Sequence, residues 1–518
     1  VMTMSLVTVS AGAKDFTDDS SITYKEAVDV ISALGVVDGY SGGDFRPDDV
    51  LTRGAAAKII CNLILGPTTA SALSAGTAPF KDVPVTNTFA GYITYCSQQG
   101  IISGYADGTF RPTGTLSSNA FMKMLLGALG YDSSIEGYTG ANWTVSVIKQ
   151  AVGIGLDDGN DEFVGSKAVT RQEAALYAFN MLQATMVEYD QKNTIVVGDI
   201  EINTTSSRKD VVNNDKTETI SDDDKMQFAE RYFDDLKLSD GDDAFGRPSN
   251  VWALKSDEIG TYAKEADATY TAKVEAGDIY KDLGLSDTVD KTDVTVFVDG
   301  ADKTDDHALA IRKGSDTKAG ESANGVLTEV YYDDDKGDIT ITQVKTYIGE
   351  ISKSVEATDK RDAYVEVITT VDSNGQKPAG ASGSEKFETA EKFDDEAKVL
   401  YTFSESEDEI QSVVLAEEAT GTVSKVVNKT NDQDNSSVTV NDTEYKASAT
   451  MASSLLSAIS VDLDYTVYLD TYGYVISVSE EDYSDYALVL EIEGSKDGGF
   501  TSDRAKLVLT TALSRRST

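Results

Sequence analysis

Apolar residues recur three or four positions apart in short stretches of the first third of the chain, and this spacing predicts amphipathic helices. Three stretches lie upstream of a glycine: Ala27, Ile31 and Leu34; Ile93 and Cys96; and Trp143, Val147 and Ala151. Two lie further downstream: Ala56, Ile59, Ile60 and Leu63; and Ala174, Tyr177 and Leu182. Thr52 and Thr170 stand at the N-cap positions of these downstream helices. The pattern therefore predicts repeated helix–loop–helix units.

The loops between these helices form a sequence repeat. The segment from Gly35 to Arg53 returns between Gly100 and Ser118, and a more divergent third copy runs from Gly153 to Arg171. In each copy ten positions separate the first glycine from a phenylalanine, and eight more lead to the last residue. A fixed spacing that returns about every 50 to 65 residues is typical of a repeated supersecondary unit.

The motifs of the first two copies resemble a known family. They open with Phe16-Thr-Asp18 and Phe80-Lys-Asp82, the second continues with Gly-Ile-Ile-Ser-Gly-Tyr-Ala-Asp-Gly-Thr-Phe-Arg-Pro, and the first ends in Leu-Thr-Arg. This pattern resembles the S-layer homology (SLH) domain, which is usually found as three tandem copies that hold a protein on the Gram-positive cell wall. The resemblance covers about the first third of the chain, and we expect copies at 14–70, 77–130 and 131–187.

The resemblance also implies a ligand. Known SLH domains bind secondary cell-wall polysaccharide, typically with pyruvylated sugars, in grooves between neighbouring copies of a three-pronged arrangement. A pyruvate ketal carries a carboxylate, which a guanidinium can meet with two parallel hydrogen bonds. The family's Thr-Arg arginine maps to Arg53 and Arg171. Further candidate contacts are Asp18 and Asp82, the loop residues Gly39, Tyr40, Gly104 and Tyr105, and Trp143, which could stack on a sugar.

Each candidate also has a purely structural explanation. The two arginines could pair with neighbouring carboxylates, Asp18 and Asp82 could cap the helices that follow them, and the two tyrosines could be packing residues. The copies differ as well, since the second has Ser118 in place of the arginine. The third has Asp157-Asp158 in place of Gly-Tyr and Gly165 in place of the proline. We therefore expect unequal grooves, with that of Arg53 dominant.

Beyond the third copy the periodicity changes from helical to alternating. Thr194–Ile202 alternates as strands do, whereas 222–238 carries Met226, Ala229, Phe233 and Leu236 at helical spacing. We expect a connecting region of strand and helix at 188–256. From 257 we expect β-rich modules of roughly 70 residues each, at 257–347, 348–419 and 420–486, with a truncated module at 487–518 whose strand at 506–510 lacks a partner.

Two patterns support the modules. Three strand pairs are joined by acidic or Tyr-Gly turns, as in β-hairpins: 330–333 with 338–341, 399–403 with 409–413, and 467–470 with 474–478. The second pattern is a faint repeat in which Gly349, Ser352 and Lys353 align with Gly421, Ser424 and Lys425. The predicted fold class is therefore α+β multidomain, with helical SLH repeats followed by tandem β modules.

The acidic composition narrows the choice of partners. The chain has 45 basic and 88 acidic residues and a net charge of −43, which argues against nucleic acid as a ligand. A solvated, aggregation-resistant surface is the first explanation. Calcium bound between modules is the alternative, but acidic runs such as Asp333-Asp-Asp335 lack the ligand spacing of an EF-hand. We therefore predict no cofactor.

Enzyme chemistry finds little support in the sequence. His307 is the only histidine, which leaves a Ser-His-Asp triad little to build on and excludes a zinc site made of several histidines. No phosphate-binding glycine loop or nucleophile elbow is present, although paired carboxylates for glycoside cleavage stay open. We predict a non-enzymatic surface protein that can self-assemble with other subunits. The alternative is an anchored wall hydrolase or adhesin with its active part in the β region or beyond the C-terminal end.

The start of the chain points to export. Residues 1–13 are apolar and end in Ala-Gly-Ala, like the tail of a secretory signal peptide cut before Lys14; a buried strand is the alternative. No apolar run approaches the length of a membrane helix, so we expect no transmembrane segment and a location at the cell wall. We expect Cys61 and Cys96 to be small core residues rather than a disulfide.

Overall fold

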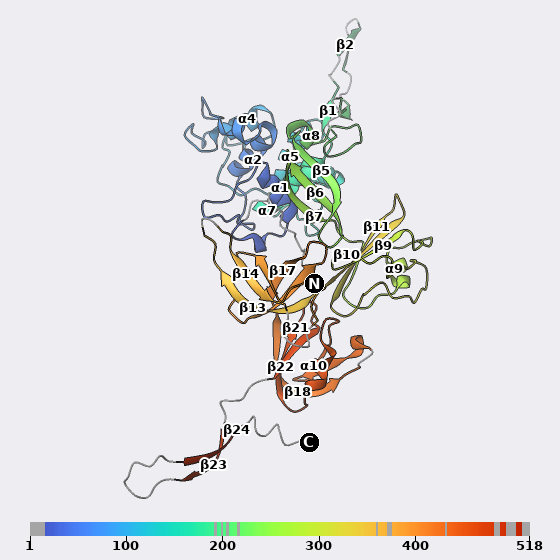
Figure 1. The fold of residues 1–518 in the computed structure, drawn as a ribbon. Helices are drawn as coiled ribbons and strands as arrows, with labels where there is room; N and C mark the ends of the chain where they lie inside the picture. Colours follow the sequence, from blue (N-terminus) through green and yellow to red (C-terminus); the bar gives the residue numbers. More distant parts are fainter. Residues whose placement is uncertain are drawn as a thin grey trace, which may run out of the picture. The chain divides into compact units, whose positions relative to one another are not determined.

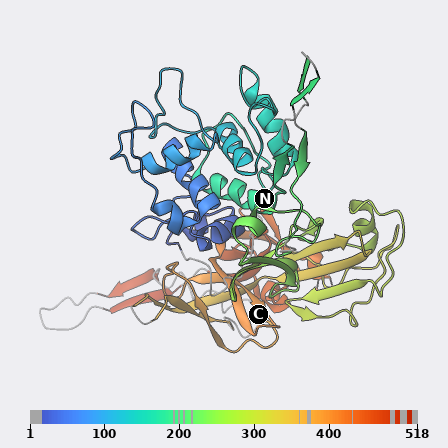
Figure 2. The same ribbon diagram turned by 90° about the horizontal axis from the view of Figure 1, so that it is seen from above.

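The computed structural model describes residues 16–190, 194–197, 200–203, 207–214, 218–358, 361–369, 376–429, 432–480, 487–493 and 504–509. The expected signal-peptide remnant at 1–13 lies outside these residues. The chain divides into two compact units (Figures 1 and 2). Unit 1 comprises 1–243 and 248–264, and unit 2 comprises 244–247 and 265–518.

Unit 1 begins with three helix–loop–helix pairs, as the apolar spacing predicts. They are α1 (Lys25–Ala33) with α2 (Arg53–Leu65), α4 (Ala90–Gln98) with α5 (Ser118–Ala128), and α6 (Trp143–Gly153) with α7 (Arg171–Gln183); the short η1 (Asp19–Ser21) and α3 (Pro67–Ser71) flank the first pair. Thr52 and Thr170 cap α2 and α7 through hydrogen bonds from Ala55 N and Glu173 N, and Ser117 caps α5 in the same way.

The three pairs are joined by a closed ring of backbone hydrogen bonds. Leu51 N donates to Val169 O, Val169 N to Leu116 O, and Leu116 N to Leu51 O, at 2.9, 2.9 and 3.2 Å. Each of these residues stands just before the N-terminus of α2, α5 or α7. The ring therefore gathers the three helix starts at one place and sets each loop against the next repeat, which gives the three-pronged arrangement that the SLH resemblance implies.

The rest of unit 1 consists of short strands and the helix α8. Its elements are β1 (Val187–Tyr189), β2 (Thr194–Val197), β3 (Ile200–Asn203), β4 (Arg208–Asp210), α8 (Phe228–Tyr232), β5 (Leu236–Asp242), β6 (Pro248–Leu254) and β7 (Asp257–Ala263). β2 pairs with β3, which confirms the strands expected there, β1 pairs with β4, and β5, β6 and β7 form an antiparallel sheet.

The prediction of one helix across 222–238 is wrong in its extent. Only Phe228–Tyr232 is helical, because Phe233 leaves the helical conformation at φ −140° and ψ 57°. From Leu236 onward the backbone pairs with β6, where Leu236 lies opposite Leu254 and Leu238 opposite Trp252. The residues Leu236 and Leu238 fit a period of two as well as a helix, and strand pairing with a distant segment decides between them.

The β5–β7 sheet belongs to the helical core of unit 1. The Trp252 ring lies 5.2 Å from the Phe179 ring of α7, and its Nε1–H donates to Glu26 Oε1 of α1 at 2.6 Å. The Tyr262 hydroxyl donates to Asp29 Oδ2 at 2.7 Å. The sheet thus closes one side of α1 and α7, and the compact unit runs on to Lys264.

Unit 2 contains three five-stranded sheets. The first, ordered β10-β9-β12-β11-β8, uses β8 (Ala268–Tyr270), β9 (Val294–Val298), β10 (Ala301–Asp302), β11 (Val326–Asp333) and β12 (Asp338–Lys345), with α9 (Ala276–Asp282) after β8. The second, ordered β15-β14-β13-β16-β17, uses β13 (Tyr347–Val355), β14 (Tyr364–Ile368), β15 (Ser384–Glu388), β16 (Lys398–Ser404) and β17 (Glu409–Leu415). The third, ordered β20-β19-β18-β21-β22, uses β18 (Glu417–Val427), β19 (Ser437–Val440), β20 (Thr443–Lys446), β21 (Asp464–Leu469) and β22 (Val475–Glu480), with η2 (Gln433–Asn435) and α10 (Ser453–Ala458) between strands.

The second and third sheets have the same strand topology. All three hairpins expected from the sequence form, as β11–β12, β16–β17 and β21–β22. The faint repeat is confirmed as well, because the register of β13 shifts between Ile351 and Lys353 and that of β18 between Val423 and Lys425. Ser352 and Ser424 therefore occupy the same β-bulge. The first sheet differs, since its β9 runs parallel to β12.

The last described strands form a hairpin of their own. β23 (Ala487–Glu493) pairs with β24 (Arg504–Leu509), so the expectation that the strand at 506–510 lacks a partner is wrong. Its partner β23 lies upstream in the sequence and is also rich in apolar residues. Among the helices of the described residues, none combines the length and the apolar character that a membrane span requires.

Candidate functional site

Two aspartates shape the loops of the first two repeats. Asp18 accepts hydrogen bonds from Phe45 N and Arg46 N, both at 2.7 Å, and Asp82 accepts them from Phe110 N and Arg111 N at the same distance. The second donor of each pair has a left-handed backbone, with φ 58° at Arg46 and 60° at Arg111. Asp18 makes no side-chain capping bond to the 3-10 helix that follows it. Both carboxylates therefore hold the loops in shape.

Arg53 reaches from the first repeat into the loop of the second. It is the first residue of α2, and its Nε donates to Phe110 O at 2.8 Å and its Nη2 to Ser103 O at 3.2 Å. The guanidinium carbon lies 4.4 Å from the centre of the Phe110 ring and 5.0 Å from that of Tyr105. Such distances allow a cation–π attraction.

Arg171 makes the same contacts at the next junction. It is the first residue of α7, and its Nε donates to Phe45 O at 2.8 Å and its Nη2 to Asp38 O at 2.9 Å. Its guanidinium carbon lies 4.8 Å from the ring centres of both Tyr40 and Phe45. The two arginines therefore occupy equivalent positions and make equivalent loop contacts at two junctions between repeats.

Carboxylates attract both guanidinium groups at longer range, Asp82 in the case of Arg53 and Asp49 and Asp18 in the case of Arg171. Within the described part of the chain, neither arginine forms an ion pair with a carboxylate. Burial lowers the pKa of both groups from its ordinary value, but arginine stays charged at any physiological pH. Simple pairing with a carboxylate therefore does not explain these two residues.

The third junction has the same backbone hydrogen bond as the other two, but a serine stands in place of the arginine. Arg53 N donates to Gly114 O, Arg171 N to Asp49 O, and Ser118 N to Lys167 O, each at 2.9 Å. Ser118 itself is buried. The third junction therefore keeps the same backbone hydrogen bond, whereas the guanidinium is absent from this position.

The loop glycines and tyrosines have separate roles. A side chain at Gly39 would collide with the Phe16 ring, and one at Gly104 with the Phe80 ring, so both glycines allow the Phe-x-Asp phenylalanine to pack on the loop. Tyr40 and Tyr105 are 40% and 42% exposed. Each ring also lies against an arginine of its own loop, Arg46 at 4.0 Å from Tyr40 and Arg111 at 4.1 Å from Tyr105.

A pocket of 360 Å³ opens beside Arg53 and is lined by all three repeats. The candidates Arg53, Gly104, Tyr105 and Trp143 line it together, which the sequence could not show. Arg171, Asp18, Asp82, Gly39 and Tyr40 do not line this pocket; Gly39 and Tyr40 lie in the loop that Arg171 contacts, with Asp18 bonded to the same loop.

Two further polar residues of this pocket were missed. Lys123 of α5 donates from Nζ to Tyr138 O at 2.7 Å and lies 5.5 Å from the centre of the Trp143 ring; burial lowers its pKa. The Tyr138 hydroxyl is buried, with no hydrogen-bond partner among the described residues. Only one signal pointed to Lys123: it is a lone charge within the apolar run 121–126. Neither residue belongs to a motif.

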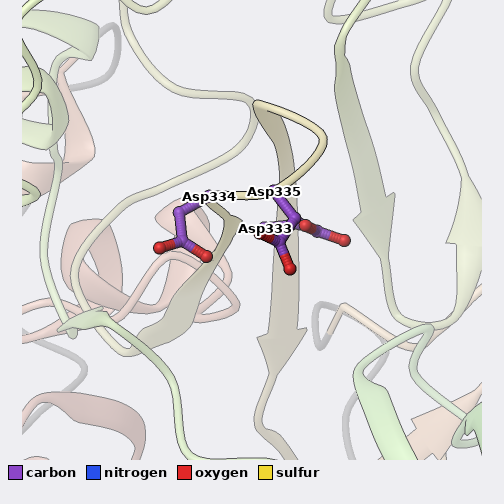
Figure 3. A group of neighbouring side chains, drawn as sticks. All are labelled: Asp333, Asp334 and Asp335. Carbon is purple, nitrogen blue, oxygen red and sulfur yellow. The ribbon is translucent and has the colours of Figure 1, made fainter. Parts of the chain in front are cut away.

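The acidic turn of unit 2 does not develop into a site. The carboxylates of Asp333, Asp334 and Asp335 lie within 4.8 Å of one another in the β11–β12 turn (Figure 3). Lys336 Nζ already donates to Asp333 Oδ2 at 2.7 Å, and the turn is largely exposed. Exposed acidic groups of this kind are common on so acidic a surface, so their proximity alone does not indicate a metal site.

Comparison with known proteins identifies the loops that form this site. The family model of the S-layer homology domain matches residues 15–57 and 79–117. The chain contains SLH domains. The matched residues include Asp18, Arg53, Asp82 and Tyr105, whereas the third helical pair lies outside them.

Several relatives carry names of cell-wall or surface-layer proteins, and one is an endoglucanase of a Bacillus species, 32% identical over 105 residues. The chain is 25% identical over 306 residues to the middle cell wall protein of Brevibacillus brevis, covering 58% of this chain and 27% of that protein. It is 26% identical over 257 residues to the surface layer protein of Brevibacillus choshinensis, covering 49% and 21%. Over 83 residues it is 37% identical to the cellulosome-anchoring protein of Acetivibrio thermocellus, covering 16% and 18%. The chain thus spans about a quarter of the first two relatives, and it is an SLH-containing, S-layer-like protein of the cell surface.

Proposed function

We propose that unit 1 anchors the protein to the cell wall by binding an acidic secondary cell-wall polysaccharide, with Arg53 as the main contact. This proposal rests on one observation: two cationic side chains, Arg53 and Lys123, line the same pocket between repeats. Within the described residues neither has a carboxylate partner. In a chain of net charge −43, two cations that line one pocket and form no close ion pair favour an anionic ligand.

The contacts of Arg53 define how it can hold a carboxylate. Its Nε and one hydrogen of Nη2 bind the loop carbonyls, so three of its five N–H groups are left, including both on Nη1. A pyruvate carboxylate can accept two of these end-on, across Nη1 and Nη2. The loop carbonyls thereby fix the guanidinium before the ligand arrives, which lowers the entropic cost of binding.

The other residues of the pocket suit a sugar. Trp143 and the exposed ring of Tyr105 offer aromatic faces on which a pyranose can stack. The Tyr138 hydroxyl and Lys123 Nζ offer donors for hydroxyl or carboxylate oxygens. We propose Arg171 with Tyr40 and Gly39 as the second, weaker groove. Asp18 and Asp82 position the loops.

Binding to purified wall polysaccharide tests this assignment. We expect Arg53→Ala to weaken binding about 10- to 100-fold, because a charge-assisted pair of hydrogen bonds is lost. Ser118→Ala is the matched control at the equivalent position of the third groove and should bind like the natural chain. Arg53→Lys should lie between, since it keeps the charge and loses the fork. Circular dichroism must show that each variant is folded.

Chemical removal of pyruvate from the same polysaccharide provides the second arm. If the ketal carboxylate is the ligand of Arg53, its removal should weaken the natural chain and leave Arg53→Ala little changed. Equal losses for Arg53→Ala and Ser118→Ala, or none, would contradict the assignment.

We propose that unit 2 is not catalytic and forms a surface array or stalk. Its single histidine, His307, lies 3.4 Å from Glu321, which forms an ion pair with Lys345 at 2.6 Å. Self-assembly with further subunits and the module ranges from 257 to 518 belong to the same proposal. Incubating the protein with wall polymers while measuring retention and reducing-end release distinguishes an anchor from the alternative, an anchored hydrolase. Release of reducing ends would refute the non-catalytic role.

A further inference from the structure

The two cysteines of the chain meet in the core of unit 1. Cys61 lies on α2 and Cys96 on α4, 35 positions apart, and both side chains are fully buried. Their sulfur atoms are 3.5 Å apart, although both are free thiols. The sequence predicts two small core residues rather than a disulfide. The structure places both in the core and also brings them into direct contact between two repeats.

The surroundings of the two sulfur atoms are reciprocal. Cys61 Sγ lies 3.6 Å from Tyr92 O, and Cys96 Sγ lies 3.6 Å from Ala57 O. Each carbonyl belongs to the residue four positions before the opposite cysteine. The helices therefore approach each other in the same way from both sides, with the sulfur atoms facing each other. A disulfide of about 2.05 Å requires the sulfur atoms to close by roughly 1.5 Å.

We propose that Cys61 and Cys96 are a disulfide site that covalently joins the first repeat to the second. Two thiols lose two protons and two electrons as the S–S bond forms, and a disulfide oxidant, such as oxidised glutathione or an extracytoplasmic oxidoreductase, is reduced to two thiols. The location at the cell surface exposes the folding chain to such an oxidant, since disulfides persist outside the cytoplasm.

The bond forms as the chain folds rather than in the folded protein. Both thiols are buried, and the hydrogen bond to Cys61, together with burial, raises the pKa of Cys96. A thiol that stays protonated and shielded exchanges slowly. Pairing therefore takes place before the core closes.

The position of the bond connects it with the groove. α2 begins with Arg53, and α4 leads directly into the loop that carries Gly104 and Tyr105. A cross-link between these helices ties together the two walls of the pocket at residues that do not line it.

Refolding the full chain with a mixture of reduced and oxidised glutathione tests the proposal. After unfolding in the presence of iodoacetamide, we expect neither cysteine to be alkylated, an intact mass about 2 Da below that of the reduced chain, and one peptide pair linked through Cys61 and Cys96. The oxidised protein should melt roughly 5 to 10 °C above the reduced protein.

Matched variants make the result decisive. Cys61→Ala and Cys96→Ala each remove one sulfur and should melt at the same temperature with and without oxidant. Quantitative alkylation of both cysteines after oxidative refolding would overturn the proposal. So would glutathione adducts in place of the internal bond, or an oxidised protein less stable than the reduced one. None of these measurements depends on polysaccharide binding, so the two proposals can fail separately.

Discussion

At the scale of single residues, the contacts of Asp18 and Asp82 explain why a Phe-x-Asp motif precedes the loops of the first two repeats. Each carboxylate accepts two successive backbone N–H groups, the second from an arginine with φ near 60°. A non-glycine residue in this conformation is strained, and the two charge-assisted bonds offset that strain. The motif aspartate thus holds the loop in shape, and under the proposed function it would affect the ligand only through that loop.

The two aspartates form a matched pair for a test of this role. Asp82→Ala and Asp18→Ala should each lower the free energy of unfolding of unit 1 by about 2 to 4 kcal/mol, because each leaves two loop N–H groups without their acceptor. Asp82→Ala should also reduce polysaccharide binding strongly, since its loop carries Tyr105 beside Arg53. Asp18→Ala should reduce it less. Urea unfolding and retention on the polysaccharide check both points, and equal binding losses would contradict the dominance of Arg53.

Lys123 offers a second residue-scale prediction. Lys123→Met keeps the length of the side chain but removes one of the two cations of the pocket. Binding should weaken about 3- to 30-fold and should depend less on salt concentration than in the natural chain. Lys149→Met, on the exposed face of α6 and outside the pocket, is the control. If both variants bound alike, Lys123 would have no part in ligand binding.

At the scale of elements, the β5–β7 sheet completes the helical anchor. Trp252 and Asn250 of β6 both donate to Glu26 Oε1, at 2.6 and 3.0 Å, and Tyr262 of β7 donates to Asp29. Trp252 is fully buried against Phe179. Motif boundaries place the end of the third repeat at 187, whereas these contacts extend the folded unit well past that point.

Truncation tests this extension of the anchor. A fragment ending at 264 should unfold in one cooperative transition and bind polysaccharide. A fragment ending at 190 would expose the apolar faces of α1 and α7, remove both donors to Glu26 and leave Asp29 with Lys25 alone, without Tyr262. Losing the buried Trp252 ring alone costs about 2 to 3 kcal/mol, so the short fragment should melt at least 10 °C lower or aggregate. Equal melting temperatures would show that the sheet is dispensable.

At the scale of the whole molecule, unit 2 buries two carboxyl groups of this acidic chain, those of Asp299 and Asp470. Asp299 is fully buried, where Lys345 N donates to Oδ1 at 2.8 Å and the Tyr347 hydroxyl to Oδ2 at 2.7 Å, with Lys345 Nζ 4.0 Å away. Asp470 is 2% exposed and accepts from Tyr472 N and Tyr474 N in the β21–β22 turn. Burial raises the pKa of each to about 6.

These two aspartates predict that unit 2 is more stable in mild acid. Because the folded-state pKa lies above the ordinary value of 3.8, the folded state binds more protons than the unfolded state between about pH 4 and 6. Each group should therefore add stability as pH falls through 6, up to roughly 2 to 3 kcal/mol near pH 4. Urea midpoints measured from pH 4.5 to 7.5 check this expectation.

Amide variants separate this effect from general charge repulsion. A net charge of −43 also weakens the folded state at higher pH through self-repulsion, so the natural chain alone cannot assign the effect. Asp299→Asn and Asp470→Asn should each flatten the dependence between pH 5 and 7, whereas Asp334→Asn on the exposed turn should leave it unchanged. A slope that persists in both buried variants would assign the effect to surface charge.

Much of the local structure follows from the sequence. The apolar spacing predicts the paired helices, because a helix buries one face against whatever covers it. Period-two runs around acidic turns predict the hairpins, because successive strand residues point to opposite faces. The faint repeat places Ser352 and Ser424 at one equivalent bulge. Arg53 and Arg171 follow from the loop motif, since a residue at a fixed distance after the loop glycine occupies the same position in each copy.

Only the tertiary structure decides what depends on residues far apart in the chain. The ring through Leu51, Leu116 and Val169 sets each arginine against the loop of another repeat, and it brings Lys123 and Tyr138 to the pocket of Arg53 although no motif links them. Strand pairing with Leu254 and Trp252 turns the expected helix at 222–238 into a strand from Leu236. The parallel β9–β12 pair, the contact between Cys61 and Cys96 and the burial of Asp299 arise in the same way. Periodicity records which face of an element is apolar, and the folded chain determines which other element covers that face.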